Sequence, residues 1–458
     1  MRKRLWQAAV LLTIVTLVFA GANLFLPKDK SLNRHMLGHD FIAFYTAGTF
    51  VRQGRAGDLY DLPQIADHQT EIVAAAGLDT RIEFDRQRFG PYWNPPFYAW
   101  LFVPLSLLPF NQALAAWMLL NLAALGGATW MLMRMLAPRG ADLDTSGRAV
   151  DWKTIGLVPL LIFLSMPFVQ AMSHGQNTPI SLCILCGVVT FWRNKRAVLA
   201  GGLCALLAYK PQLAAVVAGV LVLSLGWRAL TGLCFAGSGI VLVTQLTMPG
   251  AIVDYLHRLP ANVRWMQVEH AYMWERHATL KGFWRLLVQG REAGDLSATS
   301  LAVIGGSMTI VAALLLRAVV RQWRCPQEDA WSQVTARAWR DRLIAATVCA
   351  APLLMPFYFD YDLLLLAIPA VLMAAEEIHR PVGTQRAAST RWLGRAWIAM
   401  YVCMILNPGL AAGTRVNLNV LGLAIVAVLM TLRATPRRAP MAAETPVAIA
   451  VTVSRRAA

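Results

Sequence analysis

The stretch AVLAGGLCALLAYKPQLAAVVAGVLVLSL, residues 197–225, contains one charged residue, Lys210, in an apolar run of 29 residues. About 20 such residues form a helix that crosses the hydrocarbon core of a bilayer. A lysine followed by a proline is costly at the bilayer centre and tolerated at a helix end. We therefore predict two short helices that meet at Lys210–Pro211. Each half is short for a crossing, so a single crossing remains the alternative.

Similar apolar runs recur along the whole chain. Hydrophobic residues make up 57% of the 458 residues and charged residues 15%, against about 25% charged residues in a soluble domain. This composition excludes an ordinary soluble enzyme and predicts an all-α polytopic membrane protein. The other runs of spanning length are 7–26, 93–110, 111–136, 154–171, 176–192, 229–247, 298–320, 343–357, 361–375, 396–410 and 416–433.

The first and second of these runs need separate interpretation. Run 7–26 follows the basic residues of 1–4 and is too long for the core of a signal peptide, so we expect a retained first helix. Run 93–110 contains four prolines and is expected to form an interfacial or re-entrant segment. About twelve transmembrane helices result, in a single membrane domain over 1–436 followed by a disordered cytoplasmic tail, 437–458.

Basic residues cluster between the apolar runs and give a formal net charge of +17. Such clusters are topology signals rather than a nucleic-acid surface, because short Lys/Arg-rich loops stay in the cytoplasm. The clusters at 1–4, 193–196, 317–342, 379–395 and 433–456 place both termini in the cytoplasm. Loops 27–110 and 249–297 then face the exterior, with amphipathic helices at the membrane surface. The composition fits a bacterial inner membrane.

The cysteines indicate neither a disulfide framework nor a metal site. Six of the seven lie inside apolar runs, the exception being Cys325, and Cys183 and Cys186 form a C-x-x-C without a second ligand pair. We expect no role for them in the chemistry.

The unusual polar clusters all fall on the predicted outer face: 27–92, 174–177, 210–212, 249–297 and 360–362. An enzyme that acts on an extracytoplasmic substrate gathers its ionisable groups in this way. The positive-inside rule contributes to the pattern, because it moves arginine clusters to the opposite face.

Asp40, in Gly38-His39-Asp40-Phe41, is the first candidate for catalysis. A carboxylate beside an imidazole at the membrane surface can act as general base toward a hydroxyl group. The alternative is an N-cap of the helix that follows. Asn94 lies in the aromatic and proline-rich segment 92–98, which suits an interfacial belt or stacking on sugar rings.

The remaining candidates also have two interpretations each. Gln176 and Asn177 can bind a polyol or cap the next helix, and Lys210 can bind a phosphate or extend toward lipid headgroups. Asp360 and Asp362 can hold a cation, position an acceptor or cap a helix. The loop 249–297 mixes aromatic and basic residues, as in helices that lie on anionic lipid: Trp265, Trp274 and Trp284 with Arg264, His270, Arg276, His277, Lys281 and Arg285.

Taken in order, these motifs resemble glycosyltransferase family 87, a group of GT-C membrane enzymes that includes polyprenyl-phosphate-mannose-dependent α-mannosyltransferases. One departure is that relatives often carry a histidine shortly before the Tyr-Asp pair, where this chain has Phe357, Tyr358 and Phe359. The motifs that carry the resemblance are Gly38-His39-Asp40-Phe41 with Tyr45, Ala47 and Gly48; Leu59-Tyr60-Asp61; Trp93-Asn94-Pro95-Pro96-Phe97-Tyr98 with Pro104-Leu105 and Leu108-Pro109; Gly175-Gln176-Asn177; Ala200-Gly201 with Lys210-Pro211; and Tyr361-Asp362-Leu363.

The resemblance implies a GT-C fold whose active site faces the periplasm or cell exterior. It implies hexose transfer, with mannose the first expectation, from a polyprenyl-phosphate donor to a lipid or glycan acceptor, with inversion and Asp40 as base. Lys210, Arg264 and Arg276 would bind the donor phosphate. Neither a metal nor another cofactor is expected, since the leaving group is a monophosphate. Residues expected to contact sugar or acceptor are His39, Tyr45, Asn94, His174, Gln176, Asn177, Gln212, Asp360, Tyr361 and Asp362.

Three alternatives stay open at this point. Within the family, the donor can carry another sugar, such as arabinofuranose. Outside it, an O-antigen ligase or polymerase, or a lipid-linked glycan flippase, would also have about a dozen helices. A requirement for Asp40 discriminates between these classes.

Overall fold

The computed structural model describes residues 38–76, 89–136, 152–323, 333–379 and 388–434, together with the helical positions 7, 10, 14 and 18. The rest of the predicted first helix, 7–26, the basic residues 1–4 and the tail 437–458 lie outside the described residues. Within the described ranges the chain is helical and forms no β-strand. The α-helices are α2 (Phe41–Arg52), α3 (Leu62–Ala75), α4 (Phe110–Leu136), α6 (Trp152–Phe163), α7 (Met166–His174), α8 (Thr178–Arg193), α9 (Ala197–Ala205), α10 (Pro211–Leu225), α11 (Trp227–Thr247), α12 (Ala251–Arg264), α13 (Leu280–Gln289), α14 (Ala298–Trp323), α15 (Gln333–Leu354), α16 (Ala367–Ile378), α17 (Ala388–Thr414) and α18 (Leu418–Ala434).

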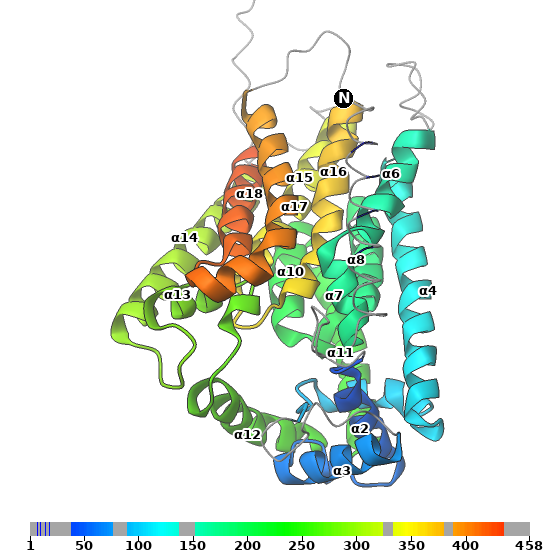
Figure 1. The fold of residues 1–458 in the computed structure, drawn as a ribbon. Coiled ribbons are helices and arrows are strands. Elements are labelled where there is room, and N and C mark those ends of the chain that lie inside the picture. Colours follow the sequence, from blue (N-terminus) through cyan, green and yellow to red (C-terminus); the bar gives the residue numbers. More distant parts are fainter. Residues whose placement is uncertain are drawn as a thin grey trace, which may run out of the picture.

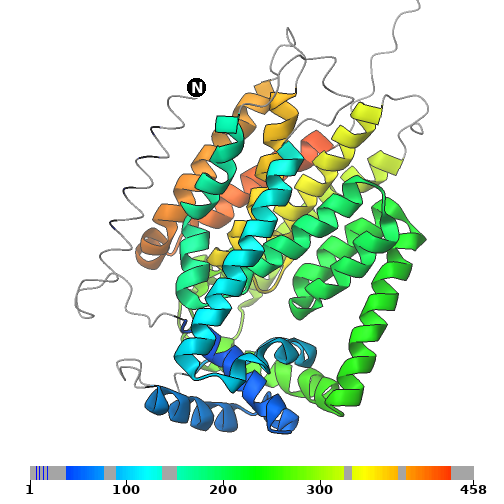
Figure 2. The same cartoon turned by 90° about the vertical axis from the view of Figure 1, so that its right-hand side faces the viewer.

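The helices form an upright bundle that is closed at one end by a second layer (Figure 1). Helices α2, α3 and α12, which we call the cap layer, cross beneath the lower end of the bundle in both views (Figure 2). The bundle and the cap layer have separate buried apolar cores. The boundary between the two layers is where the polar clusters meet.

Three described helices, α4, α11 and α14, are long and apolar enough to cross a membrane, and α6 with α7 makes a fourth if the bent pair is one crossing. The architecture is that of an all-α membrane protein, while twelve crossings remain a prediction. The predicted run 154–171 corresponds to this bent pair. The chain bends by 50° between α6 and α7, because Ser165 leaves the helical conformation and caps α7.

The chain turns back at Lys210, as the sequence predicts. Helix α9 continues through the 3₁₀ turn η4 (Leu206–Tyr209), and α10 begins at Pro211. Trp192, at the end of α8, donates a hydrogen bond of 3.0 Å to Ser224, at the end of α10. Helix α9 begins directly after α8, so the start of α9 lies close to the end of α10. Lys210 is therefore at the opposite end, next to the cap layer.

Helices α9 and α11 pack with their backbones in close approach. A Cβ atom added to Gly232 would lie 2.1 Å from the carbonyl oxygen of Val198. Only a glycine allows this spacing. The contact keeps α9, and with it Lys210, in place.

The proline-rich segment forms two 3₁₀ helices, η2 (Pro96–Phe102) and η3 (Leu105–Leu107), rather than a regular helix, as expected. Its aromatic side chains join α2 to α4. The ring of Phe102 stacks on Phe44, with centroids 4.9 Å apart, and lies 4.9 Å from the ring of Trp117. This cluster fixes the start of α2.

Ion pairs hold the other end of the bundle, which we call the far end. Arg193 of α8 binds Asp341 of α15 through two 2.7 Å hydrogen bonds. Arg342 and Arg433 both reach Glu376 at 2.7 Å. Helix α15 begins at Gln333, ten residues before the predicted start at 343. At the opposite end, which contacts the cap layer and which we call the near end, run 361–375 is regular helix only from Ala367, since η8 (Asp360–Leu366) is a 3₁₀ helix.

The segment 249–297, predicted to be an outer loop, contains the expected amphipathic helices. One face of α13 buries Leu280, Phe283 and Leu286, while α12 lies in the cap layer. Between them the chain forms a π-helical turn, η5 (Trp265–Glu269), and a 3₁₀ turn, η6 (Trp274–Arg276). Arg276 lies in η6.

Candidate active site

Five segments distant in sequence meet where the bundle contacts the cap layer. They are the turn 38–40, the α7–α8 junction 174–178, Lys210, Arg276 and the start of η8 at 360–362. Side-chain contacts join them into one cluster, described below, with three carboxylates and two cations that each pair with a carboxylate.

The backbone around Asp40 is bonded to the end of α7. The amide of Gly38 donates to the carbonyl of Ser173 at 2.8 Å, and the amide of Asp40 donates to that of His174 at 2.9 Å. Gly175 has a φ of 71°, and a Cβ there would lie 2.9 Å from the Cβ of Phe41. A glycine is therefore required where α7 ends against this turn.

The Asp40 carboxylate faces the α7–α8 junction rather than its own helix. It lies at the N-cap position of α2 but accepts no capping hydrogen bond, so the capping interpretation is wrong for this side chain. It accepts a hydrogen bond of 2.7 Å from Gln176 and lies 3.8 Å from Nδ1 of His174. Burial opposes its charge, but His174, His39, the Gln176 hydrogen bond and Arg276 together hold the pKa of Asp40 below its ordinary value. Asp40 is a carboxylate at neutral pH.

Arg276 bridges Asp40 electrostatically to a second carboxylate. Its guanidinium binds Asp360 in a two-point pair at 3.0 and 3.2 Å, a strong geometry for these groups. Gln170 donates a further hydrogen bond of 3.1 Å to Asp360. Burial disfavours the charge of Arg276, but the carboxylates of Asp360 and Asp40 raise its pKa. The guanidinium lies 5.8 Å from the centre of the Tyr361 ring.

Lys210 forms the second cation–carboxylate pair. Its Nζ lies 2.5 Å from Oδ1 of Asp362, which also accepts a hydrogen bond of 2.8 Å from Thr178. Both side chains of the pair are largely buried. The ammonium lies 5.9 Å from the centre of the Tyr361 ring. Tyr361 thus has a cation near its ring from each of two distant segments.

The segment that carries Arg276 is held by residues that the sequence did not single out. Asn417, before α18, donates hydrogen bonds of 2.9 Å to the carbonyls of Glu275 and His277. The amide of Ala278 donates to the carbonyl of Tyr358 at 2.8 Å. Gln170, Thr178 and Asn417 carry no sequence signal, because isolated polar residues at the ends of apolar runs are common.

The comparison with known families identifies the class of protein. The model of glycosyltransferase family 87 matches residues 92–356, more than half of the chain. The chain belongs to glycosyltransferase family 87. As a family 87 member with apolar helices of spanning length, it is a membrane glycosyltransferase. No curated protein and no solved structure matches the chain.

The family 87 match covers only part of the cluster. Residues 174–178, Lys210 and Arg276 lie inside the matched range, while Asp40 and the pair Asp360 and Asp362 lie outside it. The place of these three carboxylates in the site rests on the contacts described above.

Several of the site residues predicted from the sequence of this family 87 chain form hydrogen bonds to other parts of the protein. Asn177, which is 1% exposed, donates to the Tyr98 hydroxyl at 2.9 Å instead of capping α8. Asn94 donates to the carbonyl of Tyr209 at 2.8 Å. The rings of Tyr98 and Tyr209 stack 4.5 Å apart. This network lies behind Lys210 and orients the turn that carries it.

Three other nominated residues lie at the margin of the cluster or apart from it. Arg264 pairs with Asp295 at 3.0 Å and its side chain is 57% exposed, so the structure does not bring it to Asp40. The Tyr45 hydroxyl donates to the carbonyl of Leu108 at 2.8 Å, within the contact between α2 and η3. Gln212 lies in the first turn of α10, partly exposed.

An imidazole does stand beside the segment 357–359. His277 is fully buried, pairs through its backbone with Phe359, and has its ring centroid 4.5 Å from that of Phe359. Its Nε2 lies 2.8 Å from the Tyr272 hydroxyl. Burial and the charges of Lys281 and Arg276 lower the pKa of His277 to about 3. It is a neutral packing residue behind Arg276.

The carboxylates of the cluster are engaged with cations rather than with one another. Among the described residues, no three His, Cys, Asp or Glu side chains converge in an arrangement suited to a metal ion. Asp360 and Asp362 instead each face one cation.

Proposed function

We propose that this protein transfers a hexose, mannose as the first candidate, from a polyprenyl-phosphate donor to a lipid or glycan acceptor by a single displacement with inversion. The observation that carries the proposal is the cluster of Asp40 with the cations Lys210 and Arg276. It combines a carboxylate kept ionised with two positive groups, which is what a sugar transfer from a phosphate requires. Family membership favours this reaction over a flippase or an O-antigen ligase.

Asp40 acts as the general base in this proposal. As the acceptor oxygen attacks the anomeric carbon, the carboxylate takes its proton, and the bond from that carbon to the donor phosphate oxygen breaks on the opposite side. The transition state resembles an oxocarbenium ion. Gln176 and His174 hold the carboxylate in position.

Lys210 and Arg276 stabilise the phosphate as it leaves. Both are buried among carboxylates, in surroundings where a fixed positive charge acts strongly on developing negative charge. Tyr361, which has a cation near its ring from each of two segments, lines the same region, and so does His39. We propose that both contact the sugar or the acceptor. The reaction as proposed uses these side chains and no metal ion.

A donor of this class must be met at the membrane. Removing a polyprenyl chain from the bilayer costs about 0.8 kcal/mol for each CH₂ group. The cluster lies at the end of apolar helices, between the bundle and the cap layer, where a lipid-linked sugar can be reached from the side. We place this end on the periplasmic face of a bacterial inner membrane, with both termini cytoplasmic, in a single membrane domain over 1–436.

The test is transfer of radiolabelled mannose from polyprenyl-phosphate-mannose to endogenous acceptors, by membranes that carry the wild type or Asp40→Asn, with EDTA present. Removing a general base lowers a rate by roughly 10²- to 10⁴-fold, so Asp40→Asn should be almost inactive. Asp295→Asn is the matched control, because that carboxylate also lies in an outer loop and pairs only with Arg264 and its surroundings.

Each outcome has a defined meaning. Full transfer by Asp40→Asn contradicts the mechanism and directs attention to Asp360 and Asp362. Transfer only with polyprenyl-phosphate-arabinofuranose keeps the mechanism and changes the donor sugar. Loss of activity in Asp295→Asn as well would restore Arg264 to the site.

A further inference from the structure

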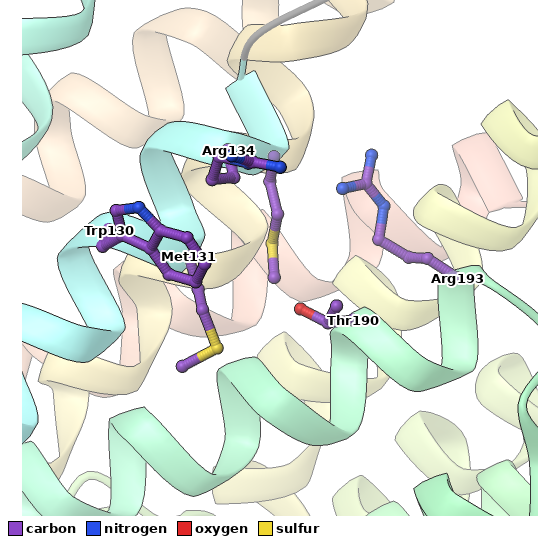
Figure 3. Close-up of a pocket in the computed structure, with 6 residues that line it drawn as sticks. Trp130, Met131, Arg134, Thr190 and Arg193 are labelled. Carbon is purple, nitrogen blue, oxygen red and sulfur yellow. The ribbon is translucent and has the colours of Figure 1, made fainter. Parts of the chain in front are cut away.

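A pocket at the far end of the bundle lies outside the candidate active site. It has a volume of about 120 Å³ and lies between the ends of α4 and α8. Figure 3 shows Trp130, Met131 and Arg134 on one side and Thr190 and Arg193 on the other. Thr190 and Arg193 are 12 and 15 residues along α8 from Thr178, so the pocket is roughly 20 Å from the cluster at 1.5 Å per residue.

Among the described residues, one cation in this pocket has no carboxylate beside it. The arginines that hold the far end are paired: Arg193 with Asp341, and Arg342 and Arg433 with Glu376. In the part of the chain that the structure describes, Arg134 contacts the ring of Trp130, 5.3 Å away, and no carboxylate. As far as the described ranges show, the pocket presents a guanidinium that no carboxylate pairs with.

Other cations add to the positive charge of this region. Lys195 lies in the turn that follows α8, and Arg340 lies one residue before Asp341. Burial and the charge of Arg340 lower the pKa of Lys195. Cations here are close enough to repel one another, and an anion would relieve that repulsion.

The length of α4 fits a position of Arg134 at the depth of lipid headgroups. It follows Phe110, the first residue of α4, by 24 residues, or about 36 Å along the helix. The hydrocarbon core of a bilayer is about 30 Å thick. Next to Arg134, Trp130 is 57% exposed, and Leu122 and Leu119, about two and three turns before Trp130, are exposed on α4. An acyl chain can run along this apolar face below a headgroup held by Arg134.

We propose that this pocket binds the phosphate of an anionic membrane phospholipid, with Arg134 as the anion-binding group. The volume admits a headgroup phosphate rather than a whole soluble ligand, since a cavity of about 150 Å³ just holds benzene. Guanidinium groups bind phosphate through two parallel hydrogen bonds. Basic pockets between helices at the membrane surface recognise such lipids.

The test is native mass spectrometry of the full-length protein in detergent, titrated with phosphatidylglycerol. A hydrogen-bonded charge contact contributes about 1.5–3 kcal/mol, so Arg134→Gln should weaken phosphatidylglycerol binding about tenfold or more. Arg228→Gln is the matched control. Arg228 lies over the ring of Trp227, 5.8 Å away, at the start of α11 and outside the pocket.

A second variant tests the pocket without removing charge. Thr190→Phe fills the space on the α8 side. The hydroxyl of Thr190 that this variant removes bonds only within α8, to the carbonyl of Cys186 at 2.8 Å. We expect the same loss of phosphatidylglycerol binding, with sugar transfer retained in both pocket variants as evidence of folding.

The outcomes separate the lipid from other sources of phosphate. Loss in Arg134→Gln and Thr190→Phe with normal binding in Arg228→Gln supports the proposal. Equal loss in Arg228→Gln and Arg134→Gln would mean a general interfacial belt and overturn it. Binding of inorganic phosphate in a way that excludes phosphatidylglycerol would assign the pocket to a soluble anion instead of a lipid.

Discussion

At the scale of single residues, the charge of Lys210 is the feature most open to test. Its side chain is 14% exposed, and its ammonium pairs with Asp362 at 2.5 Å. If it stabilises the leaving phosphate, Lys210→Met should lower kcat by roughly 10²- to 10³-fold, the range for loss of one preorganised positive or donor group. Steady-state kinetics measures this. Lys195→Met, at the far end, should be close to wild type, and equal effects of the two variants would contradict the role.

The pH dependence depends on a second residue, His174. Because the pKa of Asp40 is held below its ordinary value, near 4 for an aspartate, Asp40 stays ionised from pH 5 to 8 and does not limit the rate there. In His174→Gln, the largest of the interactions that lower this pKa is removed, and the burial that raises it remains. The acid limb of kcat/KM against pH should therefore move to higher pH.

The control for this profile is His257→Gln, which removes an exposed histidine of α12. Its acid limb should coincide with that of the wild type. An acid limb in His174→Gln that stays in place, or moves to lower pH, would show that His174 does not set the protonation of Asp40.

At the scale of helices, the contact of α9 with α11 positions the turn that carries Lys210. A Cβ on Gly232 would lie 2.1 Å from the carbonyl oxygen of Val198, so Gly232→Ala must separate the helices. Overpacking of this kind costs about 1–3 kcal/mol. We expect a lower midpoint of thermal unfolding and weaker donor binding.

Gly237→Ala is the control on the same helix. Nothing lies within 4 Å of a Cβ at Gly237, and alanine favours a helix over glycine by about 1 kcal/mol. This variant should be as stable as the wild type or slightly more so. If Gly232→Ala behaved like Gly237→Ala, the close approach would not be needed to place Lys210.

At the scale of the whole molecule, the two ends of the bundle differ in charge chemistry. The near end gathers Asp40, Lys210 and Arg276, and the far end carries the arginine pairs and the lipid pocket. We predict that the near end faces the periplasm. In a cysteine-free background, Ala293→Cys should react with an impermeant thiol reagent in intact spheroplasts, and Asn194→Cys only after permeabilisation. The opposite pattern would invert the proposed orientation.

The sequence by itself determined which segments are apolar helices and, at Lys210, where one of the apolar runs breaks. The period and length of the apolar runs depend on neighbouring residues only, so α4, α8, α11 and α14 lie close to their predicted ranges. The turn at Lys210 follows from the cost of a charge and a proline in mid-membrane. The bend at Ser165 and the 3₁₀ helix at 360–366 escaped prediction, because helix breaks inside an apolar run depend on the surrounding packing.

The tertiary structure alone decided the pairing of the charged groups. Lys210 meets Asp362 across 152 residues and Arg276 meets Asp360 across 84, and no local pattern specifies which cation takes which carboxylate. The sequence predicted Asp40, Gln176, Lys210 and Arg276 as site residues, and it predicted Arg264 in the same way, although Arg264 lies elsewhere. The reason is that a charged side chain is stable in a buried position only when an opposite charge lies beside it. That opposite charge is supplied by a different helix.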